Sequence, residues 1–448
     1  MNSRRVATGV CAFAACCAVS TNAWAQREAG PFAGLFGGGR AADATQGLAL
    51  NWSGYAGYDD TVLDQSSQLR ADPRFYQSGQ YGGLSVGLGF GRNTGRNRIN
   101  IDGGTSVRFY GATRDISAPT YAISTGFALA PARRTTIVGS VAASYSSFYQ
   151  FAPFLAVDPS GSADAPTHDF AAADQQSVVT SGTVGLSQQL SPRMSLSTSA
   201  GWNRGRFRSV GFDSTRLDGR SVSFAFRGNV SRDLGVRLGY GFQDGHFGEV
   251  PATRTAAKVH NLDMGVDYNR ALSFSRRTTL AVGTGSSLAQ SHDVQSPDRT
   301  WYFMLNARAS LTHEIRRTWT ATLDYARGTQ FVHGFNDVTV SDNVTAGLGG
   351  LLSTRVQLST SAGYSTGQVG LGANGPRFGS YTGSGELTVA LSRVVGMYAQ
   401  YMYYHYDVPP TSSAFGVLPP RLGRQALTFG LNGTLPFMKD TRSPRDSR

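Results

Sequence analysis

Residues 425–437 read QALTFGLNGTLPF. Apolar residues or glycine occupy every second position: Leu427, Phe429, Leu431, Gly433, Leu435 and Phe437. Successive side chains of a β-strand point to opposite faces, so the stretch is predicted to form a strand with one apolar and one polar face. A strand of a soluble sandwich can alternate in this way too, so the rest of the chain has to decide between the two settings.

The same alternation repeats along the whole chain. In the run that begins near residue 98, for example, Ile99 and Ile101 alternate with Asn100 and Asp102. Eighteen such runs begin near residues 48, 81, 98, 120, 135, 177, 194, 221, 235, 259, 278, 300, 317, 338, 355, 381, 395 and 425.

The connections between the runs alternate in length. One set is short and rich in arginine, as in PARR and SRD, and the other set is long. The long connections are predicted at 59–80, 150–176, 203–220, 245–258, 367–380 and 407–424. An up-and-down barrel with short periplasmic turns and long extracellular loops has this organisation.

Charged residues are missing from the centre of every apolar face. The charges within runs all fall on the polar face and are predicted to line a pore: Asp102, Arg108, Arg227, Arg237, Asp263, Asp267, Arg308, Asp324 and Glu386. A charge that faces lipid near the midplane costs about 2–4 kcal/mol, which explains the exclusion. No run of 18 apolar residues could form a spanning helix, and only helices or closed barrels satisfy every backbone group in lipid. The predicted fold is therefore all-β, a transmembrane up-and-down antiparallel β-barrel of about 18 strands.

The N-terminal residues resemble an export signal. MNSRR is followed by a short apolar stretch and by Ala23 and Ala25 in A-x-A spacing, which predicts a cleaved secretory signal at 1–25. A lipoprotein signal acylated at Cys16 is the alternative. The predicted organisation continues with a Gly/Ala-rich tail at 26–46, the barrel at 47–437 and a charged tail at 438–448. All three cysteines lie in the signal, so no disulfide is expected in the barrel, and we expect export to the Gram-negative outer membrane.

The alternating stretch that ends in an aromatic residue resembles the closing strand of outer-membrane β-barrels. The matching positions are Leu427, Phe429, Leu431, Leu435 and Phe437. The resemblance implies recognition by the barrel-assembly machinery. It also places the chain beside the porins, including the porin-like barrels that accompany exopolysaccharide export, and porins are commonly homo-trimers. Two features depart from the family pattern, namely Pro436 and the eleven residues that follow Phe437.

A constriction is expected in the third long connection. Residues 150–176 carry Asp158, Asp164, Asp169 and Asp174 without any lysine or arginine. In general porins the third outer loop folds inward, so by resemblance these carboxylates would oppose the inner-face arginines and create a transverse field. An acidic loop that lies in water is the alternative.

The connection 203–220 is basic. It carries Arg204, Arg206, Arg208, Arg216 and Arg220. These residues could contact lipopolysaccharide phosphates, attract anionic solutes to the mouth, or form a solvated loop. The net charge of the chain is +12, but nucleic acid is not an expected partner of an exported barrel.

Catalytic and metal-binding motifs are not convincing. GLSVG at 83–87 lies inside an alternating strand, and GLGANG at 370–375 precedes no helix, so neither has the context its chemistry requires. The seven histidines show no metal-ligand spacing. His260 and His405 lie near strand ends but have no evident catalytic partner, so we expect no enzyme, no metal and no cofactor.

The sequence therefore predicts a passive channel for small hydrophilic solutes. The alternatives are a barrel associated with exopolysaccharide export and a non-conducting structural or adhesive barrel. An export duct should carry aromatic residues on its inner face, and Tyr398, Tyr404 and Tyr406 would form such a track if they point inward. Alternation alone does not decide the facing of this run, because Tyr401 and Tyr403 occupy the opposite positions.

Overall fold

A computed structural model gives the fold. It describes residues 46–63, 79–110, 117–147, 149–150, 171–173, 175–209, 215–231, 234–248, 255–268, 277–292, 300–315, 318–331, 337–372, 375–407 and 421–440.

The described residues form eighteen long strands and one short hairpin. The first half of the barrel contains β1 (Gln46–Leu63), β2 (Gly79–Asn93), β3 (Asn97–Tyr110), β4 (Ser117–Ala132), β5 (Thr135–Ser146), β8 (Gln175–Ser191), β9 (Met194–Ser209), β10 (Thr215–Asn229) and β11 (Leu234–Phe247). The second half contains β12 (Thr255–Tyr268), β13 (Thr278–His292), β14 (Trp301–Ile315), β15 (Trp319–Gln330), β16 (Thr339–Ser353), β17 (Val356–Val369), β18 (Arg377–Ala390), β19 (Val395–Asp407) and β20 (Arg421–Asp440). A separate hairpin pairs β6 (Tyr149–Gln150) with β7 (Ala171–Ala173).

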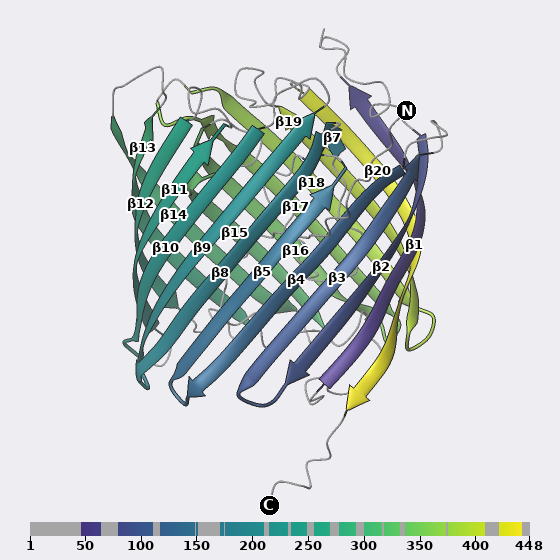
Figure 1. Cartoon of the computed structure of the whole chain (residues 1–448), viewed down its shortest axis with the longest axis horizontal. Helices are drawn as coiled ribbons and strands as arrows, with labels where there is room; N and C mark the ends of the chain where they lie inside the picture. The colour runs from purple at the N-terminus through teal and green to yellow at the C-terminus, as the bar shows by residue number, and fades with distance from the viewer. Residues whose placement is uncertain are drawn as a thin grey trace, which may run out of the picture.

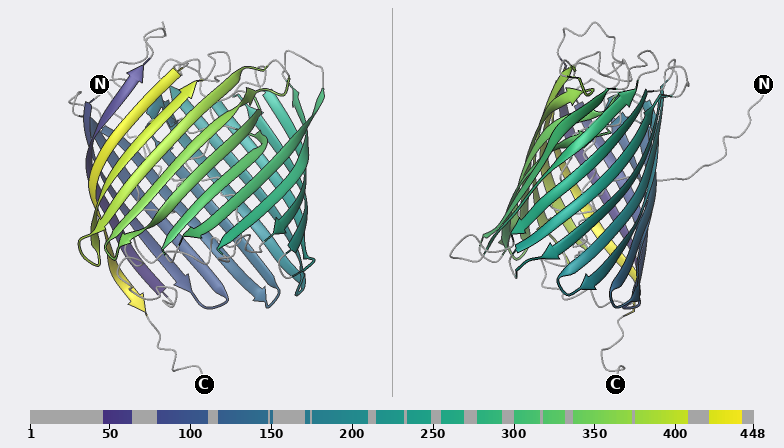
Figure 2. Two further views of the ribbon diagram at one scale, coloured as in Figure 1. Left: turned by 180° about the vertical axis from the view of Figure 1, so that it is seen from behind. Right: turned by 90° about the vertical axis from the view of Figure 1, so that its left-hand side faces the viewer.

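Each long strand pairs antiparallel with its neighbours in the chain, and the sheet closes on itself where β20 pairs with β1. The closing register places Trp52 opposite Gly433 and Ser53 opposite Asn432. Figure 1 shows β20 beside β1, and Figure 2 shows the tilted strands enclosing the interior from both sides. The predicted eighteen-stranded antiparallel barrel is confirmed. Its strands run from Gln46 to Asp440, slightly beyond the predicted limits of 47 and 437.

The strands extend further into the long connections than predicted. β9 continues to Ser209 and β10 starts at Thr215, so most of the predicted loop 203–220 is strand. The predicted loops 245–258 and 367–380 are also too long, because β11 and β12 cover the ends of the first and β17 and β18 cover the ends of the second. The charged residues in these segments resemble loop sequence, yet the backbone ladder continues beyond the apolar band. Charge there marks the membrane surface and not the end of the strand.

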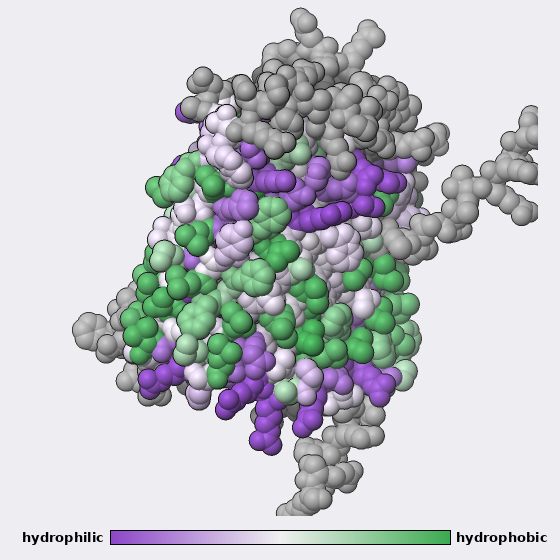
Figure 3. All heavy atoms as spheres, turned by 60° about the vertical axis from the view of Figure 1, so that its left-hand side comes forward, coloured by the Kyte–Doolittle hydropathy of each residue, from purple (hydrophilic) through white to green (hydrophobic). Residues whose placement is uncertain are grey.

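Large apolar side chains cover the outer face. Leu84, Phe303, Leu305 and Phe429 are all more than half exposed, as expected for residues that face lipid. Aromatic rings gather towards the long-loop end of this face, where Tyr364 packs on Tyr381 with ring centroids 4.9 Å apart. Such rings suit a membrane interface. Figure 3 shows the resulting apolar band between two hydrophilic bands.

None of the described residues forms a helix long and apolar enough to cross a membrane.

Candidate functional site: the barrel interior

The inner face is formed by the positions that alternate with the apolar ones. Small hydroxyl side chains pair across neighbouring strands on this face, as in Ser199 with Ser223 at 2.7 Å and Ser361 with Ser384 at 2.6 Å. The two hydroxyl groups of each pair hydrogen-bond to each other, and both side chains are small. The wall is therefore polar over much of its area without filling the interior.

The structure places the predicted pore-lining residues on this inner face. Eight of the nine have described side chains there: Asp102, Arg108, Arg227, Arg237, Asp263, Arg308, Asp324 and Glu386. The ninth, Asp267, pairs with Gly235 through its backbone, and its side chain lies outside the described part of the chain. That these residues line a water-filled pore stays a prediction.

Three of these residues form a charged cluster on one wall. The Asp263 carboxylate on β12 lies 2.6 Å from Nη2 of Arg308 on β14 and 3.2 Å from Nε of Arg237 on β11. Arg308 reaches Asp263 by crossing β13 at Gly283, where a Cβ would lie 2.6 Å from the Arg308 Nε. One carboxylate between two guanidinium groups gives this three-residue cluster a net positive charge.

The opposite wall, beside the closing seam, carries an ordered set of tyrosines. The Tyr398 ring lies over Gly430, the Tyr81 ring lies over Gly57, and each ring spans the neighbouring strand. Their hydroxyls reach Ser53 and Thr428 respectively. These tyrosines therefore tie β19, β20, β1 and β2 together from inside.

Charged groups continue this seam wall. The Arg108 guanidinium lies 4.7 Å from the centroid of the Tyr81 ring, within the range of a cation–π contact. Arg424 of β20 donates from Nε to both Asp59 oxygens of β1, at 2.9 and 2.7 Å, and both side chains are buried. Sequence reasoning missed this ion pair because the two residues are 365 positions apart.

The facing of β19, which the sequence left open, is resolved. Tyr398, Tyr404 and Tyr406 point inward and are nearly fully buried, at 3%, 2% and 0% exposure. Tyr401 and Tyr403 are exposed on the outer face. The inward rings therefore offer no open face on which a sugar could stack.

The mouth at the long-loop end is narrowed by the β15–β16 hairpin, whose inward position the sequence did not predict. β15 pairs with β14 only between Ala307–Ile315 and Trp319–Arg327, so among the described pairings 301–306 of β14 have no partner on β15. Beyond that point the end of β15 leaves β14 and turns inward. Thr329 donates a long hydrogen bond of 3.4 Å to Ser287, which lies on the inner face of β13.

Phe331, at the end of β15, packs against the inner face of β11, which lies four strands away along the sheet. The Phe331 ring lies 5.7 Å from the Phe247 ring of β11 and directly over Gly245. We call the buried apolar residues around it the mouth cluster: Leu217, Phe247, Ala257, Val259, Ala289, Val338 and Leu371. A sequence signal existed, because Leu217, Phe247 and Val259 are large apolar residues at inner-face positions where small polar residues prevail elsewhere.

The predicted constriction residues cannot be placed. Asp158, Asp164, Asp169 and Asp174 lie outside the described residues. The constriction by these carboxylates stays a prediction, and the described residues that narrow the mouth belong to the β15–β16 hairpin and to the connection that follows β17.

The closing strand has the predicted facing. The five apolar positions of the signal point outward on β20 and are exposed: Leu427, Phe429, Leu431, Leu435 and Phe437. Their recognition by assembly machinery stays a prediction. Within the described part of the chain, no three His, Cys, Asp or Glu side chains lie close enough together to hold a metal ion.

Comparisons with known proteins give distant likenesses only. No family model and no curated protein sequence matches the chain. Among solved structures, the FrpB iron transporter of Neisseria meningitidis aligns over 88% of this chain and 81% of its own at 9% identity, with a TM-score of 0.49. OccAB3 of Acinetobacter baumannii aligns over 88% and 99% at 10% identity with a TM-score of 0.44, and OpdQ of Pseudomonas aeruginosa over 88% and 98% at 8% identity with a TM-score of 0.43. Because these TM-scores lie below 0.5, we infer neither substrate nor mechanism from them.

The geometry of the barrel is sufficient to identify its structural class. A closed antiparallel sheet leaves no edge unpaired, an apolar outer belt fits lipid, and a polar inner wall fits water. The chain is a closed eighteen-stranded antiparallel β-barrel with the two faces of a membrane-spanning barrel.

Proposed function

We propose that this protein is an outer-membrane channel for the passive diffusion of small hydrophilic solutes. The observation that carries the proposal is a polar inner wall with charged side chains inside a closed barrel of eighteen strands. Eight-stranded barrels are filled by their own side chains, whereas barrels of 16–18 strands leave an aqueous channel.

The inward position of the β15–β16 hairpin favours a small solute over a polymer as the transported molecule. Phe331 and the mouth cluster occupy part of the mouth, so the free cross-section is narrower than the strand number alone implies. The buried faces of Tyr398, Tyr404 and Tyr406 favour the same choice, because a polysaccharide duct needs accessible rings. The cluster of Arg237, Asp263 and Arg308 would attract anions to one wall.

Single-channel recording tests the proposal. Purified protein reconstituted in a planar bilayer in simple salt is expected to give ohmic steps. Silence from protein shown to be folded by heat-modifiable gel migration would reject the open channel. Block of the current by an added oligosaccharide would instead favour the polysaccharide alternative.

Ion selectivity tests the role of the charged cluster. In a potassium chloride gradient, Arg237→Gln with Arg308→Gln is expected to lower the ratio of chloride to potassium permeability by about twofold or more, because the wall loses two positive charges. Arg327→Gln is the matched control, because Arg327 lies on the outer face and its loss should leave the ratio unchanged. An unchanged ratio in the double variant would remove this cluster from the permeation path.

A further inference from the structure

A group of basic side chains lies on the outer face of β9, β10 and β12, at the long-loop end. Its members are Arg204, Arg206, Arg216, Arg220 and Lys258, which we call the basic patch. The acidic residues on the same face of β10 and β11 are Asp218 and Asp244, so the net charge of this surface is about +3 with histidine neutral. Figure 3 shows the hydrophilic band on the side of the barrel that carries β10–β13, directly above the apolar belt.

The basic patch lies at the level where lipid headgroups are expected. Trp202, exposed on β9, is eight positions above Met194, the first residue of that strand, and Arg204 and Arg206 follow at the next two outward positions. At about 3.3 Å per residue and a tilt of roughly 40°, the two arginines lie about 25 and 30 Å above Met194. The apolar band of such barrels is about 25 Å tall, so both arginines lie at its upper border.

The register of β9 and β10 sets two positive charges side by side. Arg206 is paired directly with Arg216 across the two strands. Side chains in such a pair start about 5 Å apart, and like charges there are destabilising. A bound anion between the two guanidinium groups would reverse this repulsion.

Ion pairs with Asp218 position two arginines of the basic patch. Asp218 lies between Arg204 and Arg216, with each Nε 2.6 Å from one of its carboxylate oxygens. The Arg204 side chain is nevertheless 49% exposed, so its outward surface is available to a ligand. In the strand register Arg220 lies opposite Asp244, and Asp244 lies opposite Lys258 on the next strand.

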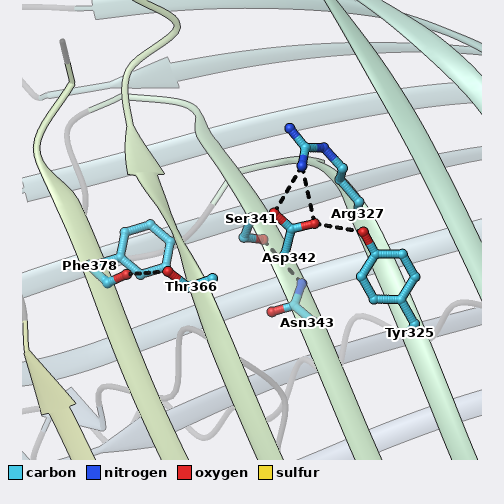
Figure 4. Close-up of polar contacts among 7 residues, drawn as sticks. All are labelled: Tyr325, Arg327, Ser341, Asp342, Asn343, Thr366 and Phe378. Atoms are coloured by element: carbon cyan, nitrogen blue, oxygen red, sulfur yellow. Dashed lines mark hydrogen bonds and ion pairs between the residues drawn. The ribbon is translucent and has the colours of Figure 1, made fainter. Parts of the chain in front are cut away.

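An ion pair on the outer face of β15 and β16 differs from the basic patch. Arg327 of β15 donates to both oxygens of Asp342 on β16, at 3.4 and 3.1 Å, and the Tyr325 hydroxyl donates to the same carboxylate at 2.8 Å. Figure 4 shows the three side chains converging on one another. This group has no net charge, and its side chains hydrogen-bond to one another, so we do not expect it to bind an anion.

We propose that the basic patch on β9–β12 binds the phosphate groups of an anionic glycolipid of the outer leaflet, namely lipopolysaccharide. Arg206 and Arg216 bracket one phosphate, while Arg204, Arg220 and Lys258 supply further charge at the same height. Guanidinium groups recognise phosphate through paired, charge-assisted hydrogen bonds. The proposal rests on the outer-membrane location but not on channel activity.

The test compares lipid binding by intact, detergent-solubilised protein. Wild-type protein, Arg206→Gln with Arg216→Gln, and the control Arg327→Gln are mixed with bisphosphorylated lipid A or with its phosphate-free counterpart. We expect the double variant to bind bisphosphorylated lipid A about tenfold more weakly than wild type, because both phosphate-bracketing charges are gone. The control should bind as wild type does, and the phosphate-free lipid should bind weakly to all three proteins.

A stability measurement separates binding from folding. Without lipid, the double variant should unfold at a urea concentration close to that of wild type, because the loss of the exposed Arg216–Asp218 ion pair offsets the removal of the repulsion between the two arginines. Bisphosphorylated lipid A should raise the urea midpoint of wild type but not that of the double variant. Equal stabilisation of both proteins would overturn the proposal. Full stabilisation of wild type by inorganic phosphate alone would overturn the assignment to a glycolipid.

Discussion

At the scale of single residues, glycine makes room for aromatic rings that span the inner wall. Tyr81 can reach Thr428 only because Gly57 on the intervening strand has no side chain. A Cβ at Gly57 would lie 2.5 Å from the Leu427 carbonyl oxygen and 2.8 Å from the Tyr81 ring. The backbone oxygen cannot move aside as a flexible side chain could. The high glycine content of the chain thus has a packing role at such positions.

We expect Gly57→Ala to destabilise the barrel by about 1–3 kcal/mol, the usual cost of overpacking. Urea unfolding of protein in lipid vesicles, followed by tryptophan fluorescence, would measure the change. Gly383→Ala is the matched control, because it is also within a strand and a Cβ there meets nothing within 4 Å. Equal stability of the two variants would show that the wall relaxes around residue 57.

At the scale of elements, the β15–β16 hairpin leaves the barrel wall and enters the mouth. Its outward-facing Thr329 meets the inward-facing Ser287, which is possible only if the hairpin folds over the interior. The fully buried Val338 lies on the other arm of the same hairpin, just beyond the last described pair Gln330–Thr339, and its carbonyl accepts from the Gly370 amide at 2.7 Å. The hairpin and the connection after β17 therefore form one apolar unit across part of the mouth.

Cross-linking tests this inward position. We expect Thr329→Cys with Ser287→Cys to form a disulfide under mild oxidation, because the two hydroxyl oxygens are 3.4 Å apart. The native cysteines all precede residue 18, outside the barrel strands. Thr329→Cys with Ser286→Cys is the control, since Ser286 is adjacent in sequence but belongs to the outward-facing set of β13. Mobility on a non-reducing gel gives the yield, and equal yields from both pairs would contradict the inward fold.

At the scale of the whole molecule, the first and last strands must find each other to close the sheet. The Arg424–Asp59 pair joins them from inside, at 6% and 7% side-chain exposure. A buried charge that loses its partner is far less stable than a buried pair. The pair thus favours the correct register between strands almost four hundred residues apart.

Arg424→Gln is expected to destabilise the barrel by about 3–5 kcal/mol, because it leaves the Asp59 carboxylate buried without its cationic partner. Arg424→Gln combined with Asp59→Asn should recover part of this loss, since no unpaired charge remains. A double-mutant cycle from urea unfolding gives the coupling energy. Strictly additive effects of the two substitutions would show that the pair does not couple the strands.

Local pattern predicted most of the fold. The period of two assigns each residue of a strand to one face, so the run at Gln425–Phe437 and its seventeen counterparts could be recognised and counted without coordinates. The inward positions of Arg237, Asp263 and Arg308 followed from the same alternation. The boundaries of the loops did not, because the charges of Arg204 and Asp218 report contact with the membrane surface and not the end of a strand.

Alternation is a local property of each strand, so the fold class, the strand number and the two faces of the wall could be predicted from the amino-acid sequence. The inward facing of Tyr398, Tyr404 and Tyr406 on β19 could not, because that run is aromatic on both faces. The positions of Asp263 between two arginines, Arg424 beside Asp59, Arg206 beside Arg216 and Phe331 against β11 were likewise visible only in the folded barrel. Those contacts depend on register and closure, which arise from pairing between distant strands and not from any one of them.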